Sequence, residues 1–188
     1  MTESEVLQTF RETRALLDGH FLLRSGLHSP QYFQCALVLQ HPRIAERLCG
    51  AMAEKLRGLG AAVVFSPAMG GLFVGHEVAR ALGLRHIFAE KNAAGQLELR
   101  RNFQIAAGEK VLVVEDVVTR GGRVQETIDI ARQRGGTVVG VGTLVDRSDG
   151  RVDFGVPLHS LLRLHVETFD PSACPLCREG RPVVKPGS

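Results

Sequence analysis

Short apolar runs alternate with segments of helical periodicity along the middle of the chain, and this alternation constrains the fold more than any other feature. The runs are uncharged and rich in β-branched residues, and they occupy residues 63–65, 87–89, 111–114 and 138–145. A strand that is apolar along its whole length is buried on both faces, which is typical of a parallel sheet between helices. We therefore predict an α/β fold with a central, mostly parallel sheet flanked by helices.

The helices of such a fold are marked by capping residues and by apolar spacing. Thr2 and Glu5 form a capping box, so a first helix is expected from there to the turn at residues 18–19. Pro42 suits the first position of a second helix. Two further helices are expected to end near residues 82 and 134.

The two ends of the chain do not follow the alternation. We predict a single domain over residues 1–188, with a core over about 41–149. Residues from about 1–40 and 150–188 are expected to pack together as a small hood beside the binding edge of the sheet.

The composition excludes several classes of protein. The formal net charge of +3 is too small to indicate a nucleic-acid partner, although it suits phosphorylated ligands. The N-terminus is polar and acidic, and no apolar run is long enough to span a membrane. Four cysteines are few for 188 residues, which favours a reduced, cytoplasmic location over a disulfide-linked scaffold.

Two carboxylates and a glycine-rich turn follow the apolar run at residues 111–114. Ligands of open parallel sheets bind beyond the carboxyl ends of the strands, so Glu115 and Asp116 are expected at the mouth of a site. Adjacent carboxylates accept hydrogen bonds from neighbouring hydroxyls, as on a ribose, and they bind Mg²⁺ directly or through water. Residues 119–123 offer backbone amides where a helix begins, which suits a phosphate. An ordinary acidic turn with a helix cap is the alternative, but the order of residue types favours the ligand site.

The stretch VLVVEDVVTRGGR at residues 111–123 resembles the diphosphate-donor motif of type I phosphoribosyltransferases. The resemblance implies the type I phosphoribosyltransferase fold and a site for 5-phosphoribosyl 1-diphosphate (PRPP), with the acids on the ribose hydroxyls and the next loop on the 5′-phosphate. The PRPP-binding residues that it implies are Glu115, Asp116, Val117, Val118, Thr119, Arg120, Gly121, Gly122 and Arg123. It also implies Mg²⁺ as the cofactor, held by the diphosphate and ribose hydroxyls near the two acids. Many relatives have a small or hydroxyl residue in place of Arg120 and of Arg123, so contact of these arginines with phosphate or with solvent stays open.

Residues 19–33 resemble the N-terminal signature of orotate phosphoribosyltransferases, and together these regions extend the resemblance over nearly the whole chain. In that family the aromatic pair corresponding to Tyr32 and Phe33 flanks the base, and Thr119 is placed to touch it. An arginine in the position of Arg147 meets orotate, whose carboxylate can pair with a guanidinium bidentately. The alternatives are that the aromatics are plain core residues and that Arg147 forms a surface ion pair.

The segment 88–103 resembles the family's mobile catalytic loop, which closes over the site of the partner subunit. The resemblance implies a homodimer and makes Lys91 the candidate for contact with the diphosphate, a role that Arg100 and Arg101 could share. A solvated hairpin would have the same sequence character. Backbone amides on the other side of the diphosphate are expected from Ala68, Met69 and Gly70. Several relatives carry a lysine where this chain has Met69.

The resemblance implies transfer of the 5-phosphoribosyl group from PRPP to orotate, giving orotidine 5′-phosphate and diphosphate in pyrimidine (UMP) biosynthesis. Such an enzyme is a pentosyl-transferring glycosyltransferase, for which we predict Lys91 and Asp116 as catalytic residues. A purine phosphoribosyltransferase is one alternative, which the aromatic pair and Arg147 disfavour. A non-enzymatic PRPP sensor is another, but only about eighteen residues precede the base signature, too few for a helix-turn-helix. A fusion to the next enzyme of the pathway does not fit 188 residues.

Cys174 and Cys177 form a single Cys-x-x-Cys motif near the C-terminus. A structural zinc site requires four ligands, no second pair stands at finger spacing, and Cys35 and Cys49 are isolated. We therefore interpret all four as plain structural cysteines, with zinc as the alternative for the pair. The seven histidines show no ligand spacing, and none is assigned a role.

Overall fold

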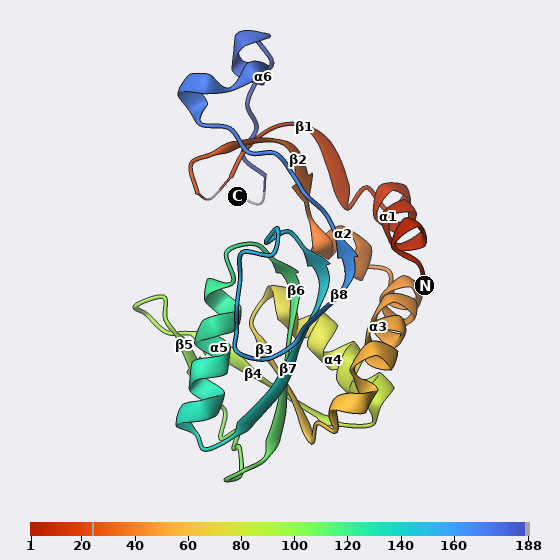
Figure 1. Cartoon of the computed structure of the whole chain (residues 1–188), viewed down its shortest axis with the longest axis vertical. Coiled ribbons are helices and arrows are strands. Elements are labelled where there is room, and N and C mark those ends of the chain that lie inside the picture. The colour runs from red at the N-terminus through yellow and green to blue at the C-terminus, as the bar shows by residue number, and fades with distance from the viewer. Residues whose placement is uncertain (24, 187–188) are drawn as a thin grey trace.

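The computed structural model describes residues 1–23 and 25–186, and at its centre lies a six-stranded sheet with the order β5-β4-β3-β6-β7-β8 (Figure 1). The strands are β3 (Val63–Pro67), β4 (Arg85–Lys91), β5 (Leu97–Leu99), β6 (Lys110–Val118), β7 (Thr137–Asp146) and β8 (Leu158–Arg163). Neighbouring strands are parallel except for β4 and β5, which form an antiparallel hairpin. The predicted α/β fold with a mostly parallel sheet is confirmed.

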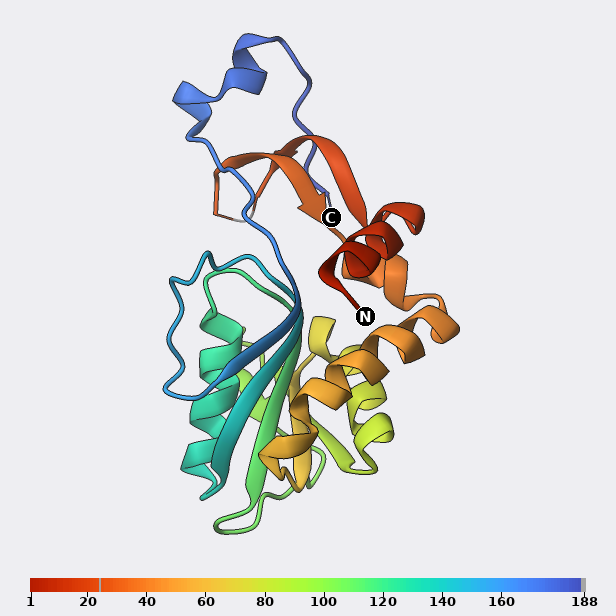
Figure 2. The ribbon, with the colours of Figure 1, turned by 45° about the vertical axis from the view of Figure 1, so that its right-hand side comes forward.

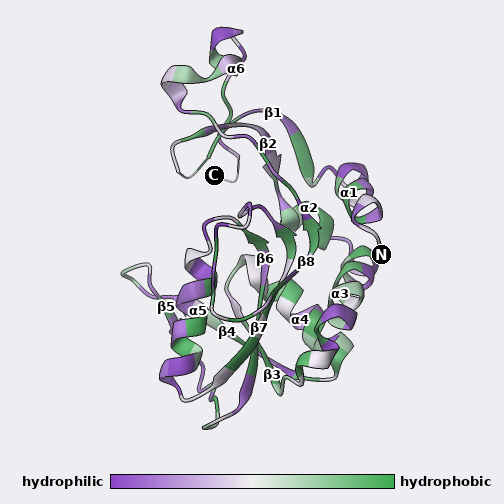
Figure 3. Cartoon of the chain, viewed as in Figure 1, coloured by the Kyte–Doolittle hydropathy of each residue, from purple (hydrophilic) through white to green (hydrophobic). Residues whose placement is uncertain are grey.

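Helices cover both faces of this sheet, and the residues of β6 show why they must. Val111 and Val113 pack in the apolar cluster that includes α5 (Gly122–Gln133). Leu112 and Val114 pack in the cluster of the opposite face, which includes α3 (Pro42–Leu56) and α4 (Gly70–Leu82). All four side chains are fully buried. Since neither face of the strand is polar, both need a helical layer, as Figure 2 shows. The central strands are accordingly mostly hydrophobic in Figure 3.

The first helix is shorter than predicted. Helix α1 spans Glu3–Glu12 and begins with the expected capping box at Thr2. It ends because Arg14 adopts a left-handed conformation with a φ of 56°. Strand β1 (Leu16–Leu22) follows, so the prediction of a helix up to residues 18–19 was wrong.

The two ends of the chain meet above the carboxyl ends of the sheet (Figure 1). Strands β1 and β2 (His28–Phe33) form an antiparallel hairpin, which α2 (Cys35–Leu39) follows. The C-terminal tail contains the short helices η2 (Pro171–Ala173) and α6 (Pro175–Arg178), and it pairs with this hairpin at two isolated bridges. Helices α1 and α2 instead pack into the apolar cluster beside α3, and η1 (Arg57–Leu59) closes α3.

Candidate active site

The two acids lie within β6 rather than after it. The strand continues through them to Val118, because its pairing with β7 persists as far as Asp146. Glu115 is buried, and its Oε1 accepts a hydrogen bond from the backbone N–H of Asp116 at 3.1 Å. Asp116 is half-buried, and its Oδ1 accepts one from the N–H of Val117 at 2.8 Å. The prediction of a strand that stops before the acids was wrong by a few residues, but the acids do lie at the carboxyl end of β6.

Burial raises the pKa of both carboxyl groups above the ordinary range, and the nearby charge of Asp116 raises the pKa of Glu115 further. A buried pair of acids is costly to ionise unless hydrogen-bond donors or a cation face it. Vicinal hydroxyls and a divalent cation are both ligands of that kind. The electrostatics of the acids therefore suit a polyol or a metal complex.

A turn that requires glycine follows β6 and opens α5. Thr119 and Arg120 are exposed, and Gly121 has a φ of 73°. A Cβ on Gly121 would lie 2.9 Å from the ring of Phe154, so the turn packs too closely against this ring for a side chain at position 121. Helix α5 begins at Gly122 and leaves its first backbone N–H groups free for an anion. The turn therefore lies outside the helix, as the phosphate site requires.

The loop from β3 to α4 packs directly against the acids. A Cβ on Gly70 would lie 2.8 Å from Oδ1 of Asp116, and a Cβ on Gly71 would lie 2.9 Å from the carbonyl oxygen of Val114. The Ala68–Met69 peptide is cis, and the Met69 side chain is 76% exposed. Of the residues predicted for the diphosphate side, Gly70 thus lies against Asp116, and Ala68 and Met69 precede it in the same loop. Gly71 was missed, because an isolated sequence does not reveal which backbone approaches it.

Arg147 follows β7 and lies at the same edge, since its N–H donates to the carbonyl oxygen of Val118 at 2.8 Å. Its guanidinium carbon lies 5.4 Å from the centre of the Phe33 ring. The Nε atom is buried and has no hydrogen-bond partner among the described residues. Burial lowers the pKa of Arg147, and the charges of Cys35 and Tyr32 oppose that shift. A partly desolvated arginine with an unpaired donor is suited to an anionic ligand.

The two aromatics of β2 have different surroundings. Phe33 is buried and packs on Phe10, with ring centres 5.8 Å apart, while its ring also faces Arg147. Tyr32 is half-buried and lies near the ring of Phe21, also at 5.8 Å. Phe33 is therefore a core residue, as one alternative held, and it touches the predicted base-binding arginine as well.

Cys35 was not predicted as part of the site. It is buried, and the pKa of its thiol is raised well above the usual range, chiefly by burial and next by the charges of Asp116 and Glu115. The thiol therefore lies within electrostatic reach of both acids and of Arg147, whose charge acts in the opposite direction. Its position two residues after β2, at the start of α2, was the only signal available in the sequence.

The predicted lid is a hairpin whose turn contains Gly95, and Figure 1 shows it projecting beside α5. Lys91 ends β4 and is exposed, and β3 lies between that strand and β6 in the sheet. Arg101 pairs bidentately with Glu90, at 2.7 and 2.8 Å. Arg100 is also exposed.

Arg123 contacts this hairpin rather than the turn at residues 119–121. Its guanidinium donates to Oε2 of Glu126 at 2.7 Å and to the carbonyl oxygen of Gly95 at 3.2 Å. Glu126 in turn accepts a hydrogen bond from the N–H of Leu97 at 2.6 Å. Arg123 therefore ties the hairpin to α5 in this structure.

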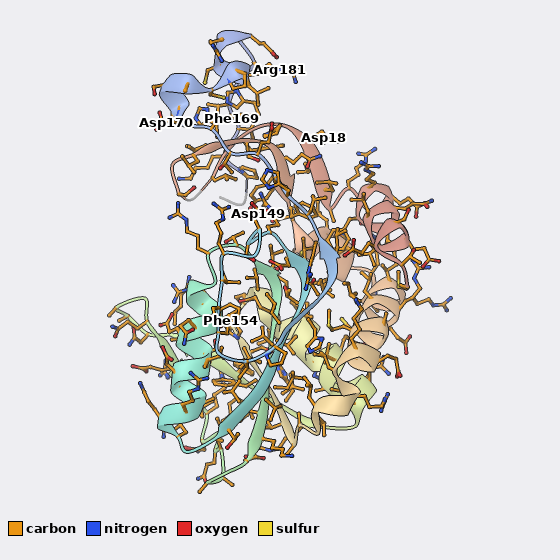
Figure 4. All side chains as sticks on the ribbon, viewed as in Figure 1. Asp18, Asp149, Phe154, Phe169, Asp170 and Arg181 are labelled. Atoms are coloured by element: carbon orange, nitrogen blue, oxygen red, sulfur yellow. The ribbon has the colours of Figure 1, made fainter. Side chains whose placement is uncertain are left out.

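Two hollows open on the described surface. One, of about 270 Å³, is lined by Asp149, Arg151 and residues 165–169. Figure 4 shows Asp149 between the sheet and the chain ends above it. A larger one, of about 610 Å³, is lined by residues 99–105 and Arg134. Neither is lined by Glu115 or Asp116, so these two hollows are not the candidate site.

Comparison with known proteins identifies the family of the chain. Residues 37–154 match the phosphoribosyl transferase domain family. The orotate phosphoribosyltransferases of Desulforamulus reducens and Pelotomaculum thermopropionicum are 52% and 54% identical, over all of this chain and 98% of each relative. The crystal structure of orotate phosphoribosyltransferase from Aeropyrum pernix has a TM-score of 0.73 at 25% identity, covering 85% of this chain and 93% of that one.

The parallel sheet, the acids at the end of β6 and the glycine turn before α5 define a phosphoribosyltransferase of type I fold. Within this class, the chain is more than 50% identical over its full length to orotate phosphoribosyltransferases. The chain belongs to the orotate phosphoribosyltransferase family.

Proposed function

We propose that the chain transfers the 5-phosphoribosyl group of PRPP to orotate, giving orotidine 5′-phosphate and diphosphate for pyrimidine biosynthesis. The observation that carries this proposal is Arg147, whose buried Nε has no partner among the described residues. A planar carboxylate such as that of orotate pairs bidentately with a guanidinium. Hypoxanthine, xanthine and adenine carry no carboxylate, so the same arginine disfavours a purine acceptor.

The donor is held by the groups that surround the end of β6. Glu115 and Asp116 accept hydrogen bonds from the ribose 2′- and 3′-hydroxyls, and their raised pKa values support this role, because hydroxyl donors stabilise the ionised form. The backbone of residues 117–122 and the first amides of α5 bind the 5′-phosphate. Residues 68–70 line the diphosphate side, next to Asp116. Arg120 is exposed and free to approach phosphate.

Catalysis rests on positioning rather than on a nucleophilic side chain. The ring nitrogen of orotate gives up its proton to solvent and forms the new bond to the anomeric carbon, and diphosphate leaves with the electron pair of the broken C–O bond. Thr119 and the aromatics Tyr32 and Phe33 orient the base, and Asp116 holds the ribose as positive charge develops on it. Lys91 reaches the diphosphate from the hairpin of a second copy of the chain, which its exposed position at the end of β4, two strands from β6, supports.

Mg²⁺ fits the donor set at the end of β6. Two carboxylates with raised pKa values are oxygen ligands that a divalent cation would stabilise. Glu115 and Asp116 would hold the ion through the ribose hydroxyls and diphosphate of the substrate, and it would neutralise the departing diphosphate.

We also propose that the chain forms a homodimer and is located in the cytoplasm. The four cysteines are free, which suits a reducing compartment. Within the described chain, no helix combines the length and apolar character that crossing a bilayer demands.

The test is the loss of orotate absorbance with PRPP and Mg²⁺, run beside hypoxanthine, xanthine and adenine as acceptors. We expect consumption of orotate alone, a fall of about a hundredfold or more in kcat/KM for Arg147→Ala, and a large loss for Asp116→Asn. The exposed Arg43→Ala and Asp129→Asn are matched controls. If Arg147→Ala consumes orotate as fast as wild type, the acceptor assignment is wrong.

A further inference from the structure

Four side chains that can ligate a metal meet where the C-terminal tail covers the β1–β2 hairpin. His20 lies on β1 and His28 begins β2, while Cys174 and Cys177 lie at the start of α6 and within it. One ligand atom from each lies within 4.8 Å of all the others. His20, His28 and Cys174 are buried and Cys177 is exposed, so the cluster has one side at the surface.

The distances within this cluster match those around a tetrahedral ion. Nε2 of His20 lies 3.6 Å from Sγ of Cys174 and 3.8 Å from Sγ of Cys177, and Nδ1 of His28 lies 3.3 Å from the latter. Zn–S and Zn–N bonds of about 2.3 and 2.0–2.1 Å place sulfur and nitrogen about 3.6 Å apart. The two histidine nitrogens are 2.8 Å apart, about 0.5 Å closer than zinc requires. Binding therefore needs only a small separation of the rings.

The outer hydrogen bond of His20 orients its ring for ligation. Nδ1 lies 2.8 Å from the carbonyl oxygen of Arg181, which can only accept, so Nδ1 carries the proton. Nε2 is then the nitrogen with the free electron pair, and it faces the two sulfurs. A backbone carbonyl on the far nitrogen is the usual outer partner of a metal-bound histidine. Figure 4 shows Arg181 in the tail, with Phe169 and Asp170 at its other end.

The tail and hairpin have little apolar core of their own, since the buried hydrophobic residues described within 17–32 and 169–184 are Phe21, Cys174 and Leu176. No described residue from 17–32 or 169–184 belongs to either apolar cluster of the protein. The backbone contacts fall instead at the two histidines, since the N–H of Val184 donates to the carbonyl of His20 and Phe169 exchanges two hydrogen bonds with His28. Small units with little apolar core are commonly stabilised by a metal or a disulfide.

We propose that His20, His28, Cys174 and Cys177 bind one structural Zn²⁺ ion. Two thiolates balance its charge, and a mixed sulfur and nitrogen set suits zinc, whereas Mg²⁺ requires oxygen ligands. All four positions are occupied by side chains, so the ion is structural and takes no part in phosphoribosyl transfer. The zinc proposal does not rest on the proposed activity, and either proposal can fail without the other.

Metal analysis of untagged protein, purified in reductant without added metal, tests the proposal directly. We expect about one zinc per chain in the wild type and less than about a tenth in the double variant Cys174→Ser/Cys177→Ser. Cys49→Ser, a buried cysteine of α3, and His41→Asn, an exposed histidine, are controls that should retain the ion. Equal zinc in the wild type and the double variant would overturn the proposal.

Cobalt binding tests the zinc proposal on the wild-type protein, so the result does not depend on whether the cysteine variants fold. After removal of zinc with a chelator, one equivalent of Co²⁺ should give the intense visible bands of tetrahedral cobalt and a thiolate charge-transfer band. A weak octahedral spectrum would contradict a zinc site. So would a Cys174–Cys177 disulfide in protein kept in reductant, which would lower the intact mass by two hydrogens. Chelation should also speed hydrogen exchange at least tenfold in residues 169–184, with little change in β6.

Discussion

Replacing Gly71 by alanine tests whether the close approach of α4 to β6 shapes the donor site. The added Cβ would lie 2.9 Å from the carbonyl oxygen of Val114, 3.0 Å from Oε1 of Glu115 and 3.1 Å from Pro67. Ordinary C···O contacts are about 3.3–3.6 Å, so α4 or β6 must move by about 0.4–0.7 Å. Overpacking of this kind costs about 1–3 kcal/mol, which the better helix propensity of alanine offsets by about 1 kcal/mol. The net loss is up to about 2 kcal/mol, which corresponds to a fall of up to about 8 °C in the unfolding temperature.

The same shift displaces Glu115, so we expect kcat/KM for PRPP to fall about tenfold. Differential scanning calorimetry and initial-rate kinetics measure the two effects. Gly50→Ala is the matched control, because Gly50 lies inside α3 with no heavy atom within 4 Å of its added Cβ and should gain about 0.5–1 kcal/mol. If Gly71→Ala unfolds at the wild-type temperature and keeps wild-type kinetics, the packing argument is refuted. A lower unfolding temperature with unchanged PRPP kinetics would refute only the link to the site.

Three further changes test the electrostatics and local structure. Burial raises the pKa of Glu115 in the folded protein. The contribution of this carboxyl group to the free energy of unfolding is therefore greatest below the ordinary glutamate pKa of about 4, and it is lost as the pH rises. Glu115→Gln should therefore raise the unfolding temperature by several degrees at pH 8, with no gain at pH 4, while it lowers turnover; a loss of stability at pH 8 would contradict this. Burial raises the pKa of Cys49 to about 12, so a thiol reagent at pH 8 should modify neither Cys49 nor Cys35 in the folded protein, and rapid labelling of either would count against the packing. Thr2→Ala removes the capping box of α1 and should cost about 1 kcal/mol in thermal unfolding, whereas an unchanged midpoint would show that the cap contributes nothing.

The sheet could be predicted because its central strands carry a local signal. Each run such as residues 111–114 is apolar at consecutive positions, and only a strand covered on both faces buries them all. Strands β5 and β8 carry no such signal, because β5 has three residues and β8 mixes polar with apolar residues at the edge of the sheet. The early end of α1 was also unpredictable, since the left-handed Arg14 is a conformation that arginine rarely adopts.

The arrangement proposed as the donor site was predictable for a similar reason, because its acids, turn and helix start follow one another within residues 111–123. The approach of Gly71 to β6 and the position of Cys35 depend on which segments the fold brings together, so no local pattern reveals them. The cluster of histidines and cysteines is the extreme case: His20 and Cys174 are 154 residues apart, and one pair comes from a hairpin and the other from the tail.

The hairpin that carries the two histidines also leads, in β2, to Tyr32 and Phe33. A metal that fixed the tail on this hairpin would therefore restrain the strand on which the base-side aromatics lie, about 10–20 Å along the chain from His28. This predicts that loss of zinc raises the KM for orotate while leaving the KM for PRPP nearly unchanged, because the donor groups lie on β6 and the first turn of α5. Steady-state kinetics of the wild type before and after chelation, with Mg²⁺ restored to both samples, distinguish the two constants. An equal change in the KM for orotate and the KM for PRPP would mean that zinc does not act on orotate binding through the hairpin.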